Sequence, residues 1–209
     1  MIKNLLFDLG GVIMDLDRER CVRAFRKLGM ENPDEFLGLY GQQGDFLALE
    51  AGEIDAKEFH RRVRPLFRDP SVTDAEIDEA FNEFLIGIPV ERLKALRELR
   101  KDYRVLLLSN TNPIMMESRI AEAFRVEGME MTDYFDGIFT SYEAKCCKPG
   151  REIFDYASRL GHMDPAETLF FDDSQKNVDA ARSYGYKAVL VRPGDEFADL
   201  LAGFMAENS

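Results

Sequence analysis

Five short apolar runs, separated by stretches with helical periodicity, constrain the fold of this chain more than any other feature. The runs are rich in Val, Ile, Leu and Phe and cover residues 3–7, 104–108, 137–140, 168–171 and 187–191. Several are apolar without alternation, which is typical of parallel strands covered on both faces. Strands that alternate with helices predict an α/β fold, namely a Rossmann-like doubly wound parallel sheet.

Residues 16–87 differ from the rest of the chain because they show helical patterns and no convincing strand. One predicted helix begins with a capping box, in which Thr73 is followed three residues later by Glu76. A helical insertion after the first strand predicts a small bundle that covers the sheet. We therefore expect residues 1–15 and 88–209 to form the α/β core and residues 16–87 to form an inserted α-helical cap domain.

Composition and charge exclude several classes of protein. The chain has 209 residues, of which 45% are apolar, so it can bury a sizeable core. Its net charge of −12 argues against nonspecific nucleic-acid or anionic-membrane binding. No apolar run approaches the length of a spanning helix, and residues 5–14 lack the pattern of a signal peptide. Three cysteines, two of them adjacent, make a poor disulfide framework. We expect a reduced, cytoplasmic protein that is a monomer or weak homodimer.

Polar residues follow four of the predicted strands, at the edge where parallel sheets bind their ligands. In chain order they are Asp8, Ser109 with Asn110, Lys148, and Asp172 with Asp173. Three carboxylates at one edge repel one another, and one lysine cannot neutralise them all. A divalent cation is therefore predicted. Oxygen ligands, without paired Cys or His, favour Mg²⁺.

Magnesium held by carboxylates and water usually serves phosphates, so the same edge predicts a phosphate site. Lys148 and the groups around Ser109 are positioned to bind phosphoryl oxygens. Gly10 and Gly11 allow the backbone to approach the metal or the phosphate closely. A small phosphorylated metabolite is the expected ligand.

These residues resemble the haloacid dehalogenase-like hydrolase superfamily along essentially the whole chain. Four motifs match in order: Phe7-Asp8-Leu9-Gly10-Gly11-Val12, Leu107-Leu108-Ser109-Asn110-Thr111, Lys148-Pro149 and Phe170-Phe171-Asp172-Asp173. Each motif is weak alone, whereas all four in this order and spacing are specific. Their details look like those of bacterial sugar-phosphate phosphatases of the α-D-glucose-1-phosphate phosphatase type.

The resemblance implies a nucleophile and a set of metal ligands. Asp8 would attack phosphorus in line and form an aspartyl-phosphate, which water then hydrolyses. Asp8, the main-chain carbonyl of Gly10 and Asp172 would hold Mg²⁺. Asp173 would be a further ligand or lie one water away.

The resemblance also implies groups that meet the substrate. Ser109 and the Asn110 amide would bind phosphoryl oxygens, and Lys148 would stabilise charge on the phosphate and the nucleophile. The segment Glu50-Ala51-Gly52-Glu53 looks like the cap loop that contacts substrate in such enzymes.

One position departs from the family pattern. Most family phosphatases carry a second aspartate two residues after the nucleophile, as general acid and base, whereas this chain has Gly10. General acid–base help typically contributes about 10²–10⁴-fold. We therefore expect a preference for leaving groups that need little protonation, such as an anomeric hydroxyl or an acyl group. Asp15 or Asp17 could replace the missing acid, although solvation of the hinge or helix capping also explains them.

The predicted function is a Mg²⁺-dependent phosphomonoesterase that acts on a small phosphorylated metabolite, with a sugar phosphate favoured. A non-catalytic phosphometabolite sensor and a phosphosugar mutase are the alternatives. A mutase must protonate and deprotonate both hydroxyls, which Gly10 disfavours. A dehalogenase needs no metal, so the pair Asp172 and Asp173 argues against it.

Other polar residues have simpler interpretations. Asn177 is expected on a helix face, from which it could orient Asp173. Cys146 and Cys147 are expected to be small buried or loop residues and not redox-sensitive thiols. The two histidines, His60 and His162, are expected to be solvated or hydrogen-bonded.

Overall fold

The centre of the protein is a parallel sheet, seen in a computed structural model that describes residues 1–38 and 44–208. The five strands have the order β5-β4-β1-β6-β7, and every neighbouring pair is parallel. They are β1 (Asn4–Phe7), β4 (Arg104–Ser109), β5 (Gly137–Thr140), β6 (Thr168–Asp172) and β7 (Lys187–Leu190). The five predicted strands and the doubly wound α/β fold are thus confirmed.

Apolar side chains on both faces of the sheet explain why its strands are continuous hydrophobic runs. Leu5 and Phe7 belong to one buried cluster, and the Phe7 ring stacks on Phe171 with centroids 4.9 Å apart. Leu6, between them, belongs to a second cluster on the opposite face. The covering helices are α6 (Val90–Leu99) and α12 (Phe197–Glu207) on the first face, and α10 (Arg151–Gly161) and α11 (Gln175–Ser183) on the second.

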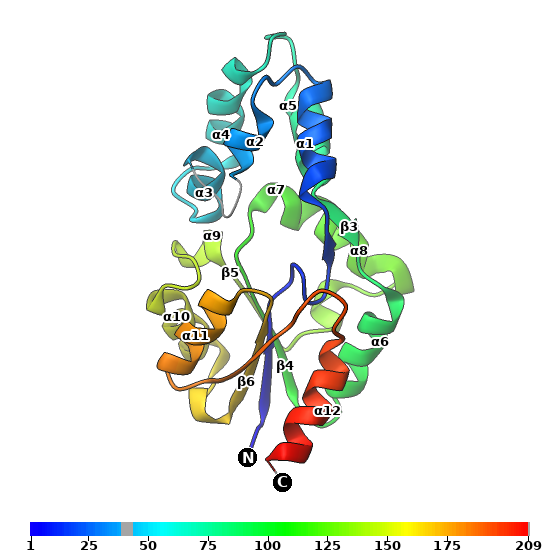
Figure 1. Cartoon of the computed structure of the whole chain (residues 1–209), viewed down its shortest axis with the longest axis vertical. Coiled ribbons are helices and arrows are strands. Elements are labelled where there is room, and N and C mark those ends of the chain that lie inside the picture. Colours follow the sequence, from blue (N-terminus) through cyan, green and yellow to red (C-terminus); the bar gives the residue numbers. More distant parts are fainter. Residues whose placement is uncertain (39–43, 209) are drawn as a thin grey trace.

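Five further helices form what we call the helical layer, beyond the carboxyl ends of the strands (Figure 1). The termini of the chain lie at the opposite end of the molecule. The layer has an aromatic centre, in which Phe59 and Phe81 stack with centroids 5.3 Å apart and Phe25 lies beside Phe81. Its helices are α1 (Arg18–Lys27), α2 (Pro33–Leu37), α3 (Gly44–Glu50), α4 (Ala56–Val63) and α5 (Asp74–Asn82).

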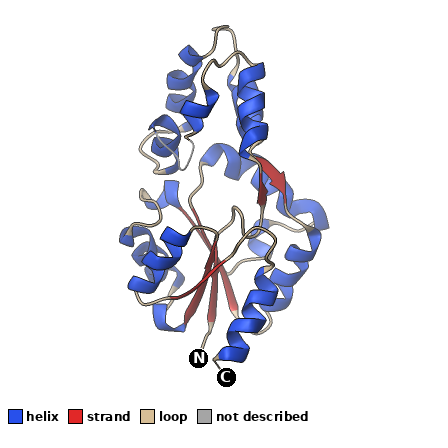
Figure 2. Ribbon diagram, viewed as in Figure 1, coloured by secondary structure: helices blue, strands red, loops and turns tan. Residues whose placement is uncertain are grey.

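The expectation that residues 16–87 contain no strand is wrong. β2 (Asp15–Leu16) pairs antiparallel with β3 (Leu85–Gly87), and Figure 2 shows this short ribbon between the helical layer and the sheet. The Asp17 main-chain N–H extends the pairing by donating to the Phe84 carbonyl oxygen at 2.9 Å. Strands of two and three residues carry no readable alternation, so the sequence pattern could not predict them.

The remaining helices are short and follow the strands closely. The predicted N-cap before the first of them is present, because the Asn112 side chain accepts from the Met115 N–H at 3.1 Å. Among residues 1–38 and 44–208, no helix is both long enough and apolar enough to cross a membrane. The helices after β4 are α7 (Pro113–Met115), the π-helical turn η2 (Met116–Ile120) and α8 (Ala121–Phe124), and α9 (Ser141–Ala144) follows β5.

A first prediction concerns the capping box of α5, which is present as the sequence predicted. The Thr73 hydroxyl accepts from the Glu76 N–H at 3.3 Å, and the Glu76 carboxylate accepts from the Thr73 N–H at 2.8 Å. Thr73→Ala removes the hydroxyl and is expected to lower the free energy of unfolding by about 1 kcal/mol. Urea denaturation measures this, and Thr73→Ser, which keeps the hydroxyl, is the control. Equal stability of the wild type and Thr73→Ala would contradict it.

Candidate active site

Asp8 follows β1 directly and lies at the carboxyl edge of the sheet. Its main-chain N–H donates to the Phe171 carbonyl oxygen at 2.8 Å, which continues the pairing of β1 with β6. One carboxylate oxygen accepts from the Leu9 N–H at 2.7 Å, so the turn that follows holds the side chain. The side chain is 13% exposed. Asp8 is therefore fixed in position but open to a small ligand.

Asp172 ends β6 and is completely buried. Its Oδ1 accepts from the Ser174 main-chain N–H at 2.8 Å and from the Asn177 side-chain amide at 2.9 Å. Asn177 was expected on a helix face, with Asp173 as a possible partner, and the structure shows it on α11 bonded to both oxygens of Asp172 instead. The reason is position: Asn177 lies on the buried side of α11, whereas Asp173 points towards solvent.

Lys148 joins the two buried carboxylates. Its ammonium nitrogen lies 2.8 Å from Asp8 Oδ1 and 2.7 Å from Asp172 Oδ2, and it also donates to the Leu108 carbonyl oxygen at 2.9 Å. The lysine is 4% exposed. A protonated lysine has three N–H donors, and these three acceptors use them all. The Lys148 ammonium group therefore interacts with buried groups of the site and not with solvent.

Ser109 and Asn110 lie at the end of β4, next to Lys148. Ser109 is 2% exposed and lines a cavity at the carboxyl edge. The Asn110 side chain accepts from the Lys148 N–H at 2.9 Å and donates to the Lys148 carbonyl oxygen at 3.0 Å. This reciprocal pair fixes the segment that carries Lys148. The amide side chain of Asn110 thus positions the lysine, a role that the sequence did not indicate.

Gly11, unlike Gly10, is required by the geometry of the edge. Its φ is +69°, a left-handed conformation that favours glycine. A Cβ atom at Gly11 would lie 2.3 Å from Asp173 Oδ2, so a side chain there would displace the carboxylate. At Gly10 the nearest atom would be the flexible end of Leu16, at 2.7 Å. Gly11 therefore allows the backbone to lie against Asp173, whereas the approach of Gly10 and Gly11 to a metal or phosphate stays a prediction.

Carboxylate oxygens from Asp8, Asp172 and Asp173 all lie within 4.8 Å of one another. Burial raises the pKa of Asp8 to about 8, an effect that Lys148 opposes and the other two aspartates reinforce. Burial and Asp172 also raise the pKa of Asp173. For Lys148, burial lowers the pKa, but Asp172 and Asp8 outweigh it and raise the pKa above its ordinary value. One cation is too few for this cluster, and three carboxylates suit a divalent ion.

Glu50, the last residue of α3, is buried at 3% exposure. Its Oε2 atom has no hydrogen-bond partner among the described residues. Burial raises the pKa of Glu50 to about 8, the Asp8 carboxylate raises it further and Lys148 opposes the rise. The sequence suggested Glu50 only as part of a loop that meets substrate, and gave no signal that its carboxyl is buried.

Asp15 and Asp17, considered as replacements for the missing acid, have structural partners. Arg92 donates to the Asp15 carboxylate at 2.8 Å. Asp17 caps α1 by accepting from the main-chain N–H groups of Glu19 and Arg20. These contacts match the simpler interpretation of both residues, as a hinge contact and a helix cap.

The remaining candidates also have simple interpretations. Burial raises the pKa of Cys147 to about 11 and raises that of Cys146, which disfavours reactive thiolates. His60 is hydrogen-bonded, with Nε2 2.6 Å from Asp78 Oδ1. His162 is exposed and follows the last residue of α10 in a left-handed conformation, with φ +49°.

Two adjoining cavities lie between the sheet and the helical layer. One, of about 340 Å³, is lined by Asp8, Lys148 and Asp173, and the other, of about 70 Å³, by Ser109 and Glu50. Both have Gly10, Leu16, Phe84 and Asn110 in their walls. A phosphate ester with its phosphoryl group at Asp8 would therefore extend its organic part towards the helical layer.

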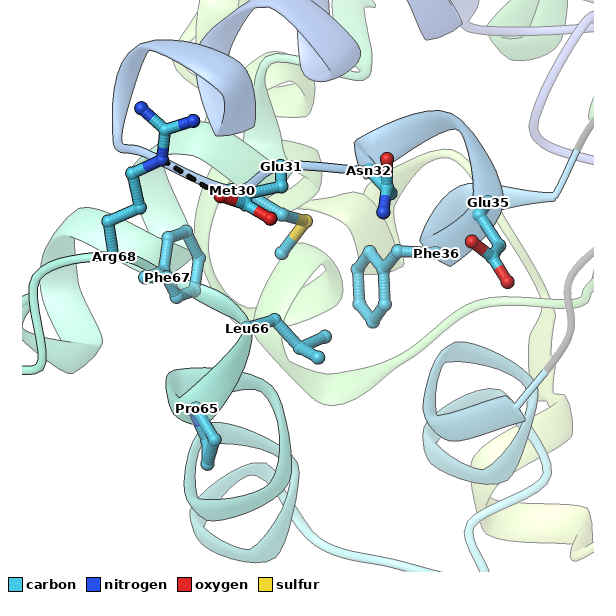
Figure 3. A pocket seen from close by; sticks show the side chains of 9 residues that line it. All are labelled: Met30, Glu31, Asn32, Glu35, Phe36, Pro65, Leu66, Phe67 and Arg68. Carbon is cyan, nitrogen blue, oxygen red and sulfur yellow. Dashed lines mark hydrogen bonds and ion pairs between the residues drawn. The ribbon is translucent and has the colours of Figure 1, made fainter.

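A separate hollow of about 560 Å³ lies within the helical layer (Figure 3). Phe36 and Leu66 face this hollow, and Glu31 forms an ion pair with Arg68 at its rim, 3.1 Å apart. None of the predicted site residues lines it. The volume of a cavity therefore does not identify the active site. The predicted site residues line the two cavities at the sheet edge instead.

Known proteins are similar to this chain in sequence. A family model described as haloacid dehalogenase-like hydrolase matches residues 2–185. The chain is 40% identical over 197 residues to the D-ribitol-5-phosphate phosphatase of Bacteroides thetaiotaomicron, covering 94% of this chain and 95% of that protein. It is 27% identical to the fructose-1-phosphate phosphatase YqaB of Escherichia coli, covering 90% and 96%.

A solved structure extends the likeness to three dimensions. The HAD family enzyme bt-2542 of Bacteroides thetaiotaomicron, crystallised in complex with magnesium and inorganic phosphate, matches with a TM-score of 0.89 at 40% identity. The match covers 96% of this chain and 99% of that one. The chain therefore belongs to the haloacid dehalogenase-like hydrolase family. Within that family it is a phosphatase, which decides the choice between an enzyme and a non-catalytic sensor.

Proposed function

We propose that this phosphatase is a Mg²⁺-dependent phosphomonoesterase that hydrolyses a small sugar or polyol phosphate through an aspartyl-phosphate. The observation that carries the proposal is the cluster of Asp8, Asp172 and Asp173 around the Lys148 ammonium, at the carboxyl edge of the sheet. The substrate class is supported by the two phosphatase relatives, whose named substrates are phosphate esters of polyhydroxylated carbon chains.

The donor set fits a magnesium ion. Asp8, Asp172, Asp173 and the Gly10 carbonyl would supply hard oxygen ligands. Burial chiefly raises the pKa of Asp8 and of Asp173, and the neighbouring carboxylates raise both further. When bound, the ion supplies positive charge that stabilises the phosphoryl oxygens and keeps the carboxylates ionised. A relative crystallised with magnesium and phosphate supports the same assignment.

Four residues of the chain would carry out the reaction, each with a different role. Asp8 is the nucleophile, because its carboxylate is fixed by Leu9 and Lys148 yet opens to a cavity. Lys148 stabilises charge on both Asp8 and the phosphoryl group. The Ser109 hydroxyl and the main-chain N–H of Asn110 bind phosphoryl oxygens. Water then attacks the aspartyl-phosphate, which releases phosphate and restores Asp8.

The helical layer is proposed to be a cap domain. The cap would consist of residues 16–87, and the core of residues 1–15 and 88–209. The paired strands β2 and β3 connect the two and would form the hinge between them. Glu50 and the residues after it would meet the substrate from the cap side. Three free cysteines support a reducing, cytoplasmic setting, in which the protein acts as a monomer or weak homodimer.

The test measures phosphate release from D-ribitol 5-phosphate after removal of divalent ions. Dialysis against EDTA is expected to lower the rate by about 10³-fold or more, because a bound cation contributes several kcal/mol to such reactions. Added Mg²⁺ should restore the rate. Circular dichroism before and after dialysis controls for unfolding. Full activity in EDTA would overturn the metal dependence, and no phosphate release from any sugar or polyol phosphate would overturn the substrate class.

A further inference from the structure

The proposed reaction needs a proton donor that the sheet edge does not supply. Hydrolysis of an alkyl phosphate expels an alkoxide, a strong base that leaves poorly unless it is protonated. Asp8 is committed as the nucleophile, and Asp172 is held by Lys148, Ser174 and Asn177. Asp173 is assigned to the metal ion with the other two carboxylates. The three protons of Lys148 are already donated to three acceptors. The donor must therefore come from another element.

Glu50 is the carboxyl group that faces this chemistry from the helical layer. It lines the smaller cavity together with Gly10 and Ser109, on the side from which the organic part of a substrate would enter. Its side chain is almost fully buried, and Oε2 has no partner among the residues that the structure describes. A buried polar atom without a partner costs free energy. Such an atom, on a residue that lines a cavity at the sheet edge, indicates a group that binds substrate.

The protonation state of Glu50 suits a donor. Burial raises its pKa to about 8, so the carboxyl group holds its proton at neutral pH. The charged groups that face it are Asp8, which raises this pKa, and Lys148, which lowers it. The nearby Cys147 thiol is neutral at this pH, since its own pKa is raised to about 11.

The backbone that follows Glu50 is docked onto the core. Lys145 donates to the Gly52 carbonyl oxygen at 2.8 Å. Gly52 has φ +61°, and a Cβ atom there would lie 2.2 Å from the Tyr142 carbonyl oxygen. Only glycine permits this contact between the segment after α3 and α9. The end of α3, and with it Glu50, is thereby fixed over the sheet edge.

We propose that Glu50 is the general acid and base of the reaction, a role that rests on the proposed phosphatase function. In the first step, an Asp8 oxygen bonds to phosphorus, the bond from phosphorus to the ester oxygen breaks, and that oxygen takes the Glu50 proton and leaves as the alcohol. In the second step, Glu50 carboxylate takes a proton from water. The oxygen of that water bonds to phosphorus, the bond to Asp8 breaks, and phosphate leaves. Glu50 is again protonated.

The experiment compares two substrates in Glu50→Gln. Expulsion of p-nitrophenolate needs little protonation, whereas expulsion of the ribitol alkoxide needs it fully. Glu50→Gln is expected to lower kcat/KM for D-ribitol 5-phosphate by about 10²–10⁴-fold and to leave kcat/KM for p-nitrophenyl phosphate nearly unchanged, because kcat/KM reports only the first step. Loss of the base slows the second step, and with it kcat, for both substrates. The ratio of the two rates does not depend on the folded fraction of the variant. Glu79→Gln, at an exposed position of the helical layer that lines neither cavity at the sheet edge, is the matched control.

The outcomes separate the two proposals. Wild-type protein that hydrolyses neither substrate would overturn the proposed function. An active wild type whose ratio of the two kcat/KM values is unchanged in Glu50→Gln would overturn the role of Glu50 alone. If Glu50→Gln does not fold, Glu50→Asp tests the same point, because it keeps the titrating group and is expected to shift the ratio in the same direction by a smaller factor.

Discussion

Asp8→Asn is expected to reduce phosphate release by about 10⁴- to 10⁶-fold, the range found when a nucleophile is removed from an enzyme that works through a covalent intermediate. Asparagine has nearly the same shape, and its side-chain oxygen can still accept from the Leu9 N–H, as Asp8 does at 2.7 Å. What it lacks is the anionic oxygen that attacks phosphorus. Steady-state release of phosphate from p-nitrophenyl phosphate measures the loss, and this substrate separates the nucleophile from the acid.

The stability of Asp8→Asn serves as the control. The pKa of Asp8 is raised on folding to about 8, so its ionisation favours the unfolded chain. Protonation of Asp8 therefore stabilises the folded protein. This contribution is complete below the pKa of an aspartate in the unfolded chain and is lost as pH rises towards 8. Asparagine cannot ionise, so in EDTA at pH 7 Asp8→Asn should melt no lower than the wild type. Substantial residual turnover in a well-folded variant would contradict the nucleophilic role.

The strands of the sheet and the polar residues at its carboxyl edge could be predicted from the sequence, because both depend on patterns of neighbouring residues. Strands covered on two faces must be apolar throughout, as Leu5 to Phe7 and Leu106 to Leu108 are. Parallel strands bring their carboxyl ends together, so Asp8 and Asp172 were placed at one edge without any knowledge of register. The carboxylate cluster of the candidate site was thus predictable from position in the chain.

Contacts between distant elements were not predictable in this way. The bond from Asn177 to Asp172, in place of the possible partner Asp173, could not be predicted because core packing around Val178 and Ala181 sets the rotation of α11 against β6. Glu50 gave no sign of burial, since glutamate at the end of a short helix is usually exposed. Its burial depends on how α3 docks on α9, a tertiary contact that carries no sequence pattern.

The sequence and the structure lead to different expectations about the leaving group at the site that contains Gly10. From the sequence, a glycine at this position predicts dependence on a good leaving group. In the structure, Glu50 lines the same cavity as Gly10 and offers a protonated carboxyl group from the helical layer. If Glu50 is the acid, the wild type should hydrolyse alkyl and aryl phosphates at comparable rates, and the steep dependence should appear only in Glu50→Gln.

Lys148→Met is expected to have the largest effect on stability. The ammonium group lies 2.8 Å from Asp8 and 2.7 Å from Asp172, with all three side chains almost fully buried. Removal of the ammonium leaves the completely buried Asp172 carboxylate without its charge partner, which costs about 3–5 kcal/mol. Methionine fills similar volume without charge, so the loss reports the electrostatics. Urea denaturation in EDTA measures it, and Lys176→Met, at an exposed position in the wall of the larger cavity, is the control.

Magnesium is expected to restore part of that stability, because a divalent ion neutralises the carboxylates that Lys148 otherwise compensates. The increase in the free energy of unfolding on adding Mg²⁺ should therefore be larger in Lys148→Met than in the wild type. Catalysis should not recover with it: the Lys148 charge also faces the transferred phosphoryl group, and its loss is expected to lower kcat by about 10²–10³-fold at saturating Mg²⁺. A variant that is as stable as the wild type in EDTA would show that the buried charges at this edge do not depend on the lysine.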